Sequence, residues 1–268
     1  MNSRLTPVVA VLIAVSAGPV WAAPLAAHRA VYEIELDEAS ERSGITGMRG
    51  RMVYDFGGSA CDGYTVSFRF VTQIDTEEAS RLTDQQTTTF ENVEEQVFQF
   101  ATRSFVDQRQ DRDVKGVASD GSVELSKPEE RSIELADAAF PTQHTIELLK
   151  AAERGDRLYE RMLFDGSDDA DRVLSTTAVI GSRQTHGDEV DEDGNALPDE
   201  FGGMGFWPVS VAYYGTAEQG GGESVPLYRI EMDLYENGVA RDIVMDYGDF
   251  RLKGTLSEIE MNEADACD

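Results

Sequence analysis

Apolar residues recur at every second position along most of the chain, and this pattern limits the fold more than any other feature. The clearest case is the stretch 64–75, where Tyr64, Val66, Phe68 and Phe70 alternate with polar residues. A period of two is typical of β-strands that bury one face. Strands are predicted at 30–37, 52–54, 64–75, 87–90, 97–105, 111–117, 122–125, 131–135, 157–164, 172–180, 207–214, 228–234, 239–245 and 250–259.

One stretch, 142–154, has the spacing of a helix instead. Thr142 is expected to cap its start, because a threonine oxygen can accept a hydrogen bond from an amide of the first turn. Gly155 can adopt the left-handed conformation that ends a helix. An apolar stripe at spacings of three and four, which would pack on the sheet, consists of Ile146, Leu148, Leu149 and Ala152.

The strands are predicted to form one antiparallel sheet. Asp120-Gly121 and Asn237-Gly238 each join two strands and favour tight hairpins. No linker rich in Pro and Ser divides the chain. We therefore expect a single domain, 23–268, built as a curled sheet or half-open barrel. A two-layer sandwich is the alternative.

The first 22 residues are predicted to be a signal peptide. Arg4 supplies a positive charge, 7–17 is a short apolar run, and cleavage is expected after Ala22. A membrane anchor is the alternative, but an apolar span needs about 20 residues. No second apolar run follows, so no transmembrane segment is predicted. The chain has 23 basic and 51 acidic residues and a net charge of -28, which argues against binding to nucleic acid.

The chain has two cysteines, Cys61 and Cys267. An even number in an exported chain favours a disulfide. The chain-entropy model gives such a long loop a stabilisation of about 5 kcal/mol. Two free thiols or a zinc pair are the alternatives, although His28, His144 and His186 show no ligand spacing around either cysteine.

The sequence shows no catalytic motif, and no catalytic residue or cofactor is predicted. His144, near the start of the helix, could act as a base, but a packed histidine is the favoured interpretation. Four carboxylates follow a predicted strand and could form a pair of glycosidase type, although a solvated turn explains them as well. They are Asp165, Asp168, Asp169 and Asp171.

The acidic segment 187–205 partly matches a calcium-binding loop. It has a Glu at the first position and Pro198 in its second half, so a solvated surface loop is the alternative. The candidate ligands are Glu189, Asp191, Asp193 and Glu200, with Gly194 at the sixth position.

Six aromatic residues on the strands could line a concave apolar surface that holds a lipid or an acyl chain. An ordinary packed core is the alternative. The six are Phe68, Phe70, Phe98, Phe100, Phe206 and Trp207.

Several stretches of the chain have a familiar sequence. They are LAAHRAVYEIEL, FPTQHTIELLKAAERGD followed by FDGSDD, WPVSVAYY, and LYENGVARDIVMDYGDFRLKGTL. Together they resemble the EipB family of periplasmic cell-envelope integrity proteins. The resemblance implies an antiparallel β-spiral, similar to periplasmic lipoprotein carriers, with a helix against it and a disulfide between Cys61 and Cys267. It also implies a tetratricopeptide-repeat protein as a partner. It implies no catalytic residues, and 188–200 looks like an insertion.

These observations lead us to expect a non-enzymatic protein of the periplasm. It would maintain the cell envelope through protein contacts and could bind a lipid or lipoprotein ligand. The alternative is a periplasmic hydrolase of envelope glycans or lipids, with Asp165 or His144 as the acid or base.

Overall fold

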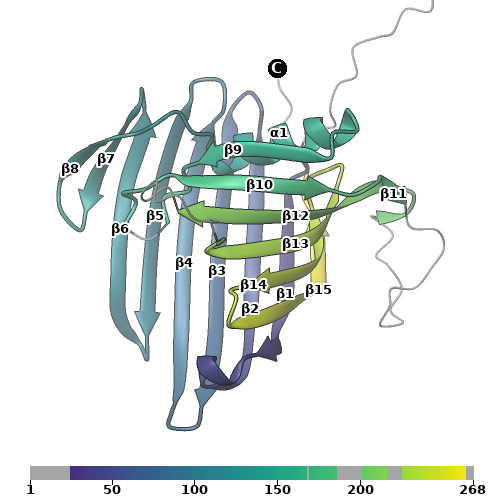
Figure 1. The fold of residues 1–268 in the computed structure, drawn as a ribbon. Helices are drawn as coiled ribbons and strands as arrows, with labels where there is room; N and C mark the ends of the chain where they lie inside the picture. The colour runs from purple at the N-terminus through teal and green to yellow at the C-terminus, as the bar shows by residue number, and fades with distance from the viewer. Residues whose placement is uncertain (1–24, 168, 186–200, 216–224, 264–268) are drawn as a thin grey trace, which may run out of the picture.

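The computed structural model describes residues 25–167, 169–185, 201–215 and 225–263 (Figure 1). These residues form one α-helix, α1 (Pro141–Glu153), and a short 3-10 helix, η1 (Glu41–Ser43). The strands of the first half are β1 (His28–Ala39), β2 (Ile45–Ser59), β3 (Gly63–Thr76), β4 (Ser80–Asn92), β5 (Val97–Val106), β6 (Arg109–Ser119), β7 (Ser122–Lys127) and β8 (Arg131–Glu134). Those of the second half are β9 (Leu158–Leu163), β10 (Leu174–Ile180), β11 (Gln184–Thr185), β12 (Gly205–Gly215), β13 (Tyr228–Tyr235), β14 (Ala240–Asp246) and β15 (Phe250–Met261).

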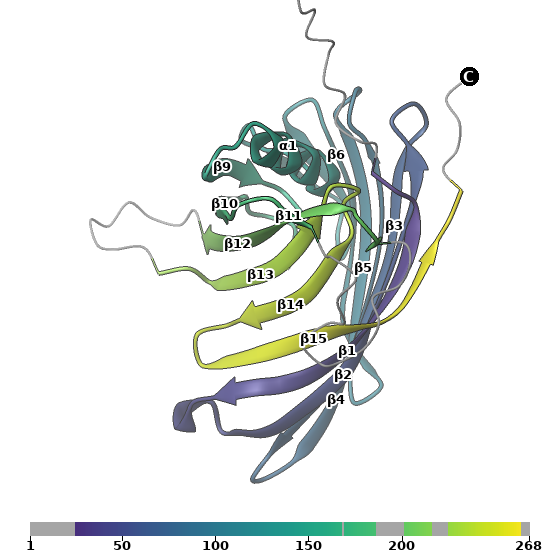
Figure 2. The same cartoon turned by 90° about the vertical axis from the view of Figure 1, so that its right-hand side faces the viewer.

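All these strands belong to one antiparallel sheet with the order β8-β7-β6-β5-β4-β3-β2-β1-β15-β14-β13-β12-β10-β9, and β11 pairs with β12. The last strand pairs with the first, so the ends of the described chain meet in the middle of the sheet. β1 to β8 form a long wall, and β9 to β14 curl over its concave face (Figures 1 and 2). The predicted curled sheet is confirmed, and the sandwich alternative is wrong because one ladder of hydrogen bonds connects all the strands.

The sheet does not close into a barrel, since β8 and β9 are its two edges. Aromatic packing joins the two ends instead. The ring of Phe164, just after β9, meets Phe98 and Phe100 of β5 edge to face, at centroid distances of 6.3 and 5.7 Å. Phe140, just before α1, stacks on Phe98 at 5.2 Å. Such pairs favour offset or edge-to-face geometry. Beside them the amide of Ala139 donates to the carbonyl of Met162 at 2.8 Å, and the amide of Phe164 donates to the carbonyl of Ala139 at 2.9 Å. The curl is therefore held by side chains and by this short backbone bridge. We call this cluster of rings the aromatic seam.

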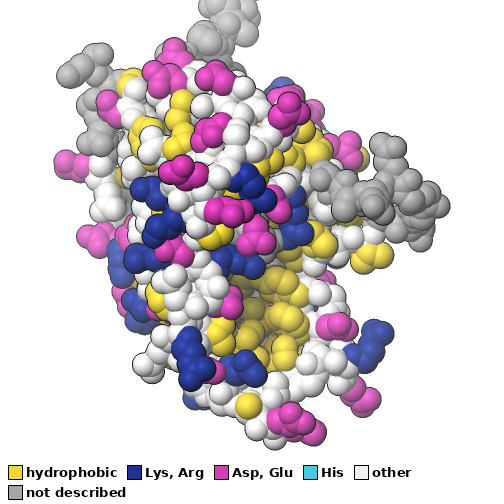
Figure 3. Space-filling view, turned by 90° about the vertical axis from the view of Figure 1, so that its left-hand side faces the viewer, with side chains coloured by type: hydrophobic (Ala, Val, Ile, Leu, Met, Phe, Trp, Pro, Cys, Tyr) yellow, Lys and Arg dark blue, Asp and Glu magenta, His cyan; other side chains and the backbone are white. Residues whose placement is uncertain are grey.

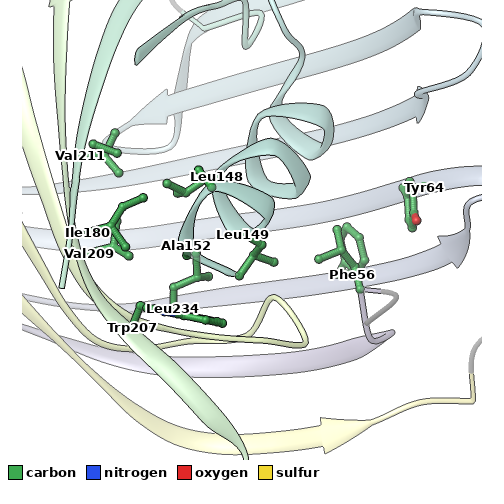
Figure 4. Close-up of a cluster of buried hydrophobic side chains, with 13 residues drawn as sticks. Phe56, Tyr64, Leu148, Leu149, Ala152, Ile180, Trp207, Val209, Val211 and Leu234 are labelled. Carbon is green, nitrogen blue, oxygen red and sulfur yellow. The ribbon is translucent and has the colours of Figure 1, made fainter. Parts of the chain in front are cut away.

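Helix α1 lies inside the curl, between β9 and the long wall (Figures 1 and 2). Leu148, Leu149 and Ala152 of the predicted stripe are buried, and Ile146 packs at the edge of the same core. Figure 4 shows this core, in which the stripe meets Phe56 and Tyr64 on one side and residues of β10, β12 and β13 on the other. The predicted helix is therefore confirmed, together with its contact with the sheet.

The predicted cap of the helix is wrong. The helix begins one residue earlier, at Pro141, which suits the first helical position because it has no amide to satisfy. Phe140 takes the capping position, and its side chain makes no capping bond. The other end is as expected: Gly155 has a φ of 81°, and the amides of Gly155 and Asp156 return to carbonyls of the last turn.

Both predicted hairpins are confirmed, between β6 and β7 and between β13 and β14. Asp120 and Gly121 have positive φ angles of 50° and 74°, as a tight β6–β7 turn requires. Two strands are much longer than predicted, because β2 and β4 continue through residues without apolar alternation. In β4 threonines replace apolar residues: Thr72 bonds Thr83, and Thr87 bonds Thr102, across neighbouring strands.

Candidate functional site

An apolar cavity of about 230 Å³ lies on the concave side of the sheet, beside the first turn of α1. Its walls come from β1, β2, β3, β13, β14 and the turn between the last two. Such a volume lies just below the range of about 300–1,000 Å³ typical of pockets for drug-sized ligands. The lining residues are Leu25, His28, Tyr32, Met52, Tyr54, Phe56, Val66, Pro141, Thr142, Thr145, Met232, Leu234, Asn237, Gly238, Ala240 and Ile243.

The cavity continues into a wider apolar surface. Tyr32, Met52 and Ile243 line the cavity and also belong to a second hydrophobic cluster on β1, β2, β14 and β15. Figure 3 shows an open apolar hollow on one side of the molecule, with charged side chains around it. We call the cavity and this surface together the groove. Partly buried residues that extend it are Leu36, Met48, Phe68, Phe70, Ile230 and Phe250.

A buried carboxylate fixes the helix beside the cavity. Glu91, near the end of β4, is only 1% exposed. Its Oε2 accepts a hydrogen bond from the amide of Thr142 at 2.7 Å, and its Oε1 accepts one from the amide of Gln143 at 2.8 Å. These amides belong to the turn in which a helix leaves its donors unpaired and its dipole favours negative charge. Glu91, a residue of strand β4, therefore caps the start of helix α1.

Burial and hydrogen bonding act on Glu91 in opposite directions. Burial raises the pKa of the carboxyl, and the hydrogen bonds from Gln143 and Thr142 lower it, with burial the larger effect. Removing a carboxylate from water is costly unless donors replace the lost hydration. The two helix amides supply those donors, and this explains why a carboxylate can stand on the buried face of β4.

Two uncharged polar groups face the cavity from the sheet. Nδ1 of His28 lies 2.7 Å from the carbonyl of Ala26, so this nitrogen carries the proton and donates it. Burial lowers the pKa of His28, which keeps the imidazole neutral at pH 7. Its ring lies 5.8 Å from that of Tyr54 and 5.9 Å from that of Phe56. Burial also raises the pKa of the Tyr54 phenol.

His144 points away from the cavity, toward β10. Its Nε2 lies 2.9 Å from Oγ1 of Thr176, which in turn donates to the carbonyl of Arg161 at 2.8 Å. Since the threonine proton is already used, Nε2 of His144 must be the donor of the first bond. Burial lowers the pKa of His144 to about 4, and its ring packs edge to face on Tyr159 at 5.3 Å. This is the environment of a packed neutral histidine.

The acidic residues after β9 lie in a turn beside the groove. Oδ1 of Asp165 accepts the amide of Ser167 at 2.9 Å, a local turn contact. Asp169 lies 3.8 Å from the guanidinium of Arg112, and both side chains are exposed to water. Asp168 lies outside the described residues. Within the described ranges no three His, Cys, Asp or Glu residues are close enough to hold a metal ion.

The aromatic residues predicted to share one surface are divided among four places. Phe68 and Phe70 lie in the groove, as expected, while Phe98 and Phe100 form the aromatic seam. Trp207 packs in the core under α1. Phe206 packs against Tyr235 with tilted rings in a separate cluster, because successive residues of a strand point to opposite faces. The prediction that the six aromatic residues line one surface is therefore wrong for four of them, Phe98, Phe100, Phe206 and Trp207.

Some predicted sites lie outside the described residues. They are the signal peptide 1–22, the calcium candidates Glu189, Asp191, Asp193 and Glu200, and Cys267. These predictions stay as they were. Sequence reasoning missed Glu91 and assigned no partner to His28. The only sequence feature that could have indicated the burial of Glu91 is its position: it continues the inward-facing series of Thr87 and Thr89. That feature is weak evidence.

Comparison with known proteins relates this fold to a described family. The family model described as EipB-like matches residues 20–263. The cell envelope integrity protein EipB of Brucella abortus (strain 2308) is 47% identical over 242 residues, which covers 88% of this chain and 84% of the relative. A crystal structure from Brucella abortus, of a beta-barrel-like protein of a domain of unknown function, is similar with a TM-score of 0.82. It is 45% identical and covers 89% of this chain and 99% of its own. No helix in the described part of this chain is long and apolar enough to cross a membrane.

The cap on α1 can be tested by removing its carboxylate. Glu91→Ala leaves two buried amides without an acceptor, and each such group costs about 1–3 kcal/mol. We expect the free energy of unfolding, measured in urea, to fall by about 2–3 kcal/mol. The matched control is Glu95→Ala, a nearby exposed residue of the β4–β5 turn. Equal stability of the two variants would show that Glu91 does not hold the helix.

The buried His144 predicts a pH dependence. Its folded pKa of about 4 lies below the unfolded value of 6.5, so the unfolded chain binds the extra proton between these values. The contribution of His144 to stability is full above pH 6.5 and is lost as the pH falls toward 4, by up to about 3 kcal/mol. His144→Gln keeps a donor for Thr176 but does not titrate. Between pH 6.5 and 4 the wild type should therefore lose more stability than this variant, and parallel curves would refute the assignment.

Proposed function

Since the chain belongs to the EipB-like family, we propose that it acts in the periplasm as a non-enzymatic protein that helps maintain the cell envelope. We further propose that its groove binds an acyl chain of a lipid or lipoprotein. One observation carries this proposal: Tyr32, Met52 and Ile243 both line the cavity beside α1 and belong to the apolar cluster on β1, β2, β14 and β15, so the cavity adjoins that cluster. A linear apolar chain is the ligand whose shape matches such a path.

The dimensions and chemistry of the groove support this ligand class. The cavity volume of about 230 Å³ is below the range typical of pockets for drug-sized ligands, so it suits one slender apolar chain better than a bulky compact molecule. Each methylene that leaves water contributes about 0.8 kcal/mol, so a chain of ordinary length gains enough to bind reversibly. The relative from Brucella abortus is named for cell envelope integrity, and the envelope is where such chains are abundant.

A non-enzymatic role is supported by the positions of the candidate acids and bases. His144 donates to Thr176, and Asp165 accepts an amide of its own turn. Neither faces the cavity. We also propose, from the family resemblance alone, that a periplasmic tetratricopeptide-repeat protein is a partner. Capture of such a protein by the tagged chain from a periplasmic extract tests this, and its absence after crosslinking would count against it.

Export and a disulfide between Cys61 and Cys267 are part of the proposal. The sheet supports the pairing: His28 is opposite Phe56 of β2 and also opposite Met261 of β15. Strand β15 therefore ends at the same end of the sheet as the β2–β3 hairpin, which carries Cys61. From Met261, a further six residues reach Cys267, and six extended residues span about 20 Å. The bridge would tie the C-terminus to that hairpin.

The groove can be blocked from within. Val66 lines the cavity, so the larger side chain of Val66→Phe should fill it. Tetradecanoic acid should then need a concentration about tenfold higher or more to displace a fluorescent apolar probe. Val71 is the matched control, because it lies on the same strand but on the opposite face. Val71→Phe should leave binding unchanged. Equal binding by both variants, or none by the wild type, would contradict the groove as the site.

The disulfide is tested by Cys61→Ser. Without reductant, this variant should unfold at a lower urea concentration than the wild type, by about 2–4 kcal/mol of stability. With reductant, the wild type should become as unstable as the variant. Labelling of both cysteines by a thiol reagent in the exported protein would show that the bridge does not form.

A further inference from the structure

We infer that the groove binds an acyl chain in one orientation. An acyl chain enters with its uncharged methyl end toward α1, and its headgroup stays at the open end, because the inner end excludes a negatively charged group. This inference rests on the proposed function and names the ligand more closely: an amphiphile whose acyl chain has one apolar end.

In the part of the chain that the structure describes, the lining of the inner end of the groove holds no charged group to balance a negative charge. Arg241 of β14 lies close enough to Tyr32 to lower the pKa of its phenol, against the larger effects of burial and Tyr54, but its guanidinium lies over the ring of Phe201, outside the lining. None of the described residues that line the cavity is Lys, Arg, Asp or Glu. His28 already donates from Nδ1 to the carbonyl of Ala26, so its other ring nitrogen can only accept while the ring is neutral. An anion placed here would lose its water and meet no cation in the described cavity lining, and the cost of such burial is high.

Glu91 adds a like charge to this end. Thr142 joins the two features, because it is a lining residue of the cavity and its amide donates to Glu91. Tyr54 also lines the cavity and lies close enough to Glu91 for the carboxylate charge to raise the pKa of its phenol, after the larger effect of burial. Both oxygens of Glu91 are engaged by helix amides, so the charge is fixed in place. Its field opposes a second carboxylate or a phosphate in the cavity.

The open end of the groove has the opposite character. Tyr213 and Tyr228 stack at 4.4 Å, Tyr247 lies 6.0 Å from Tyr228, and Phe250 stacks on Tyr247 at 4.9 Å. Tyr247 is 39% exposed. Tyrosines with one apolar side and one wet end are typical of a boundary between apolar surface and water.

Charges of both signs lie near this aromatic row. Tyr228 belongs to the same strand face as Ile230 of the groove, and the charges of Asp165 and Arg172 act on the pKa of its phenol, which burial raises. Arg112 of β6 lies near Asp169 in the same region. A headgroup here keeps water and meets charged side chains, so either sign of charge can be accommodated. The two ends of the groove therefore suit the two ends of an amphiphile.

The test compares two ligands of equal length on the chain that begins after Ala22. Tetradecanoic acid carries one carboxylate, and tetradecanedioic acid carries one at each end. Both compete with the neutral fluorescent probe N-phenyl-1-naphthylamine. We expect the monoacid to displace the probe and the diacid to need a concentration about tenfold higher or more. Equal potency would overturn the direction of the groove but leave the proposed function intact, whereas no displacement by either acid would overturn the proposed function itself.

Glu91→Gln tests the source of the discrimination. The amide oxygen can still accept one helix amide, while the negative charge is gone. The diacid concentration needed to displace the probe, divided by the monoacid concentration needed, should fall by about threefold or more in this variant. This ratio should stay unchanged in the control Glu95→Gln. An unchanged ratio in Glu91→Gln would overturn the role of Glu91.

A second measurement uses the wild-type groove and does not depend on a variant. The chain that begins after Ala22 contains one tryptophan, Trp207. It lies opposite Leu234, a residue of the inner cavity wall. Bromine quenches tryptophan fluorescence at close range. An ω-bromododecanoic acid, brominated at the chain end, should quench Trp207 more than an α-bromo acid of the same length. Stronger quenching by the α-bromo acid would show the reverse orientation.

Discussion

The contact between Glu91 and the first turn of α1 determines how the two halves of this molecule meet. An open curled sheet has little edge pairing to hold its roof in position, because β8 and β9 do not bond to each other and, among the described residues, β9 pairs beyond the sheet only with Ala139, through one short bridge. Glu91 belongs to the wall, and the amides that it accepts belong to the helix under the roof. A charge buried without these amides would be unfavourable, and the amides without the charge would be unpaired. Each group therefore requires the other.

The aromatic seam and the Glu91 cap both fix the position of the start of helix α1. Phe140 packs on Phe98 immediately before the helix starts, and Thr142 bonds Glu91 immediately after. The helix is held at its beginning, with its apolar stripe on the core under it. The space that remains between its first turn and the sheet is the cavity. In this account the groove is the part of the concave face that neither the helix nor the seam fills.

Local patterns in the sequence predicted the strands, the helix and the hairpins well, because these depend on alternation, spacing and turn residues. The curl and the cap depend on contacts between distant residues. Glu91 lies 51 residues from Thr142, and no local rule relates a charge at the end of one strand to a helix so far along the chain. The threonines of β4 misled in a similar way: their hydrogen bonds to neighbouring strands replace apolar burial, so the strand is longer than its apolar residues indicate. The resemblance to a family supplied the spiral shape, and only the structure located the cavity.

The most direct test of this account is a crystal structure of the chain with ω-bromododecanoic acid, in which anomalous scattering locates the bromine. We expect a bromine peak inside the cavity, among His28, Tyr54 and Thr142, and a carboxylate near the tyrosines at the open end. A bromine peak at the open end, with the carboxylate beside Glu91, would contradict the proposed direction. A crystal in which the ligand is fully occupied but the bromine lies only outside the groove would show that the groove is not the binding site.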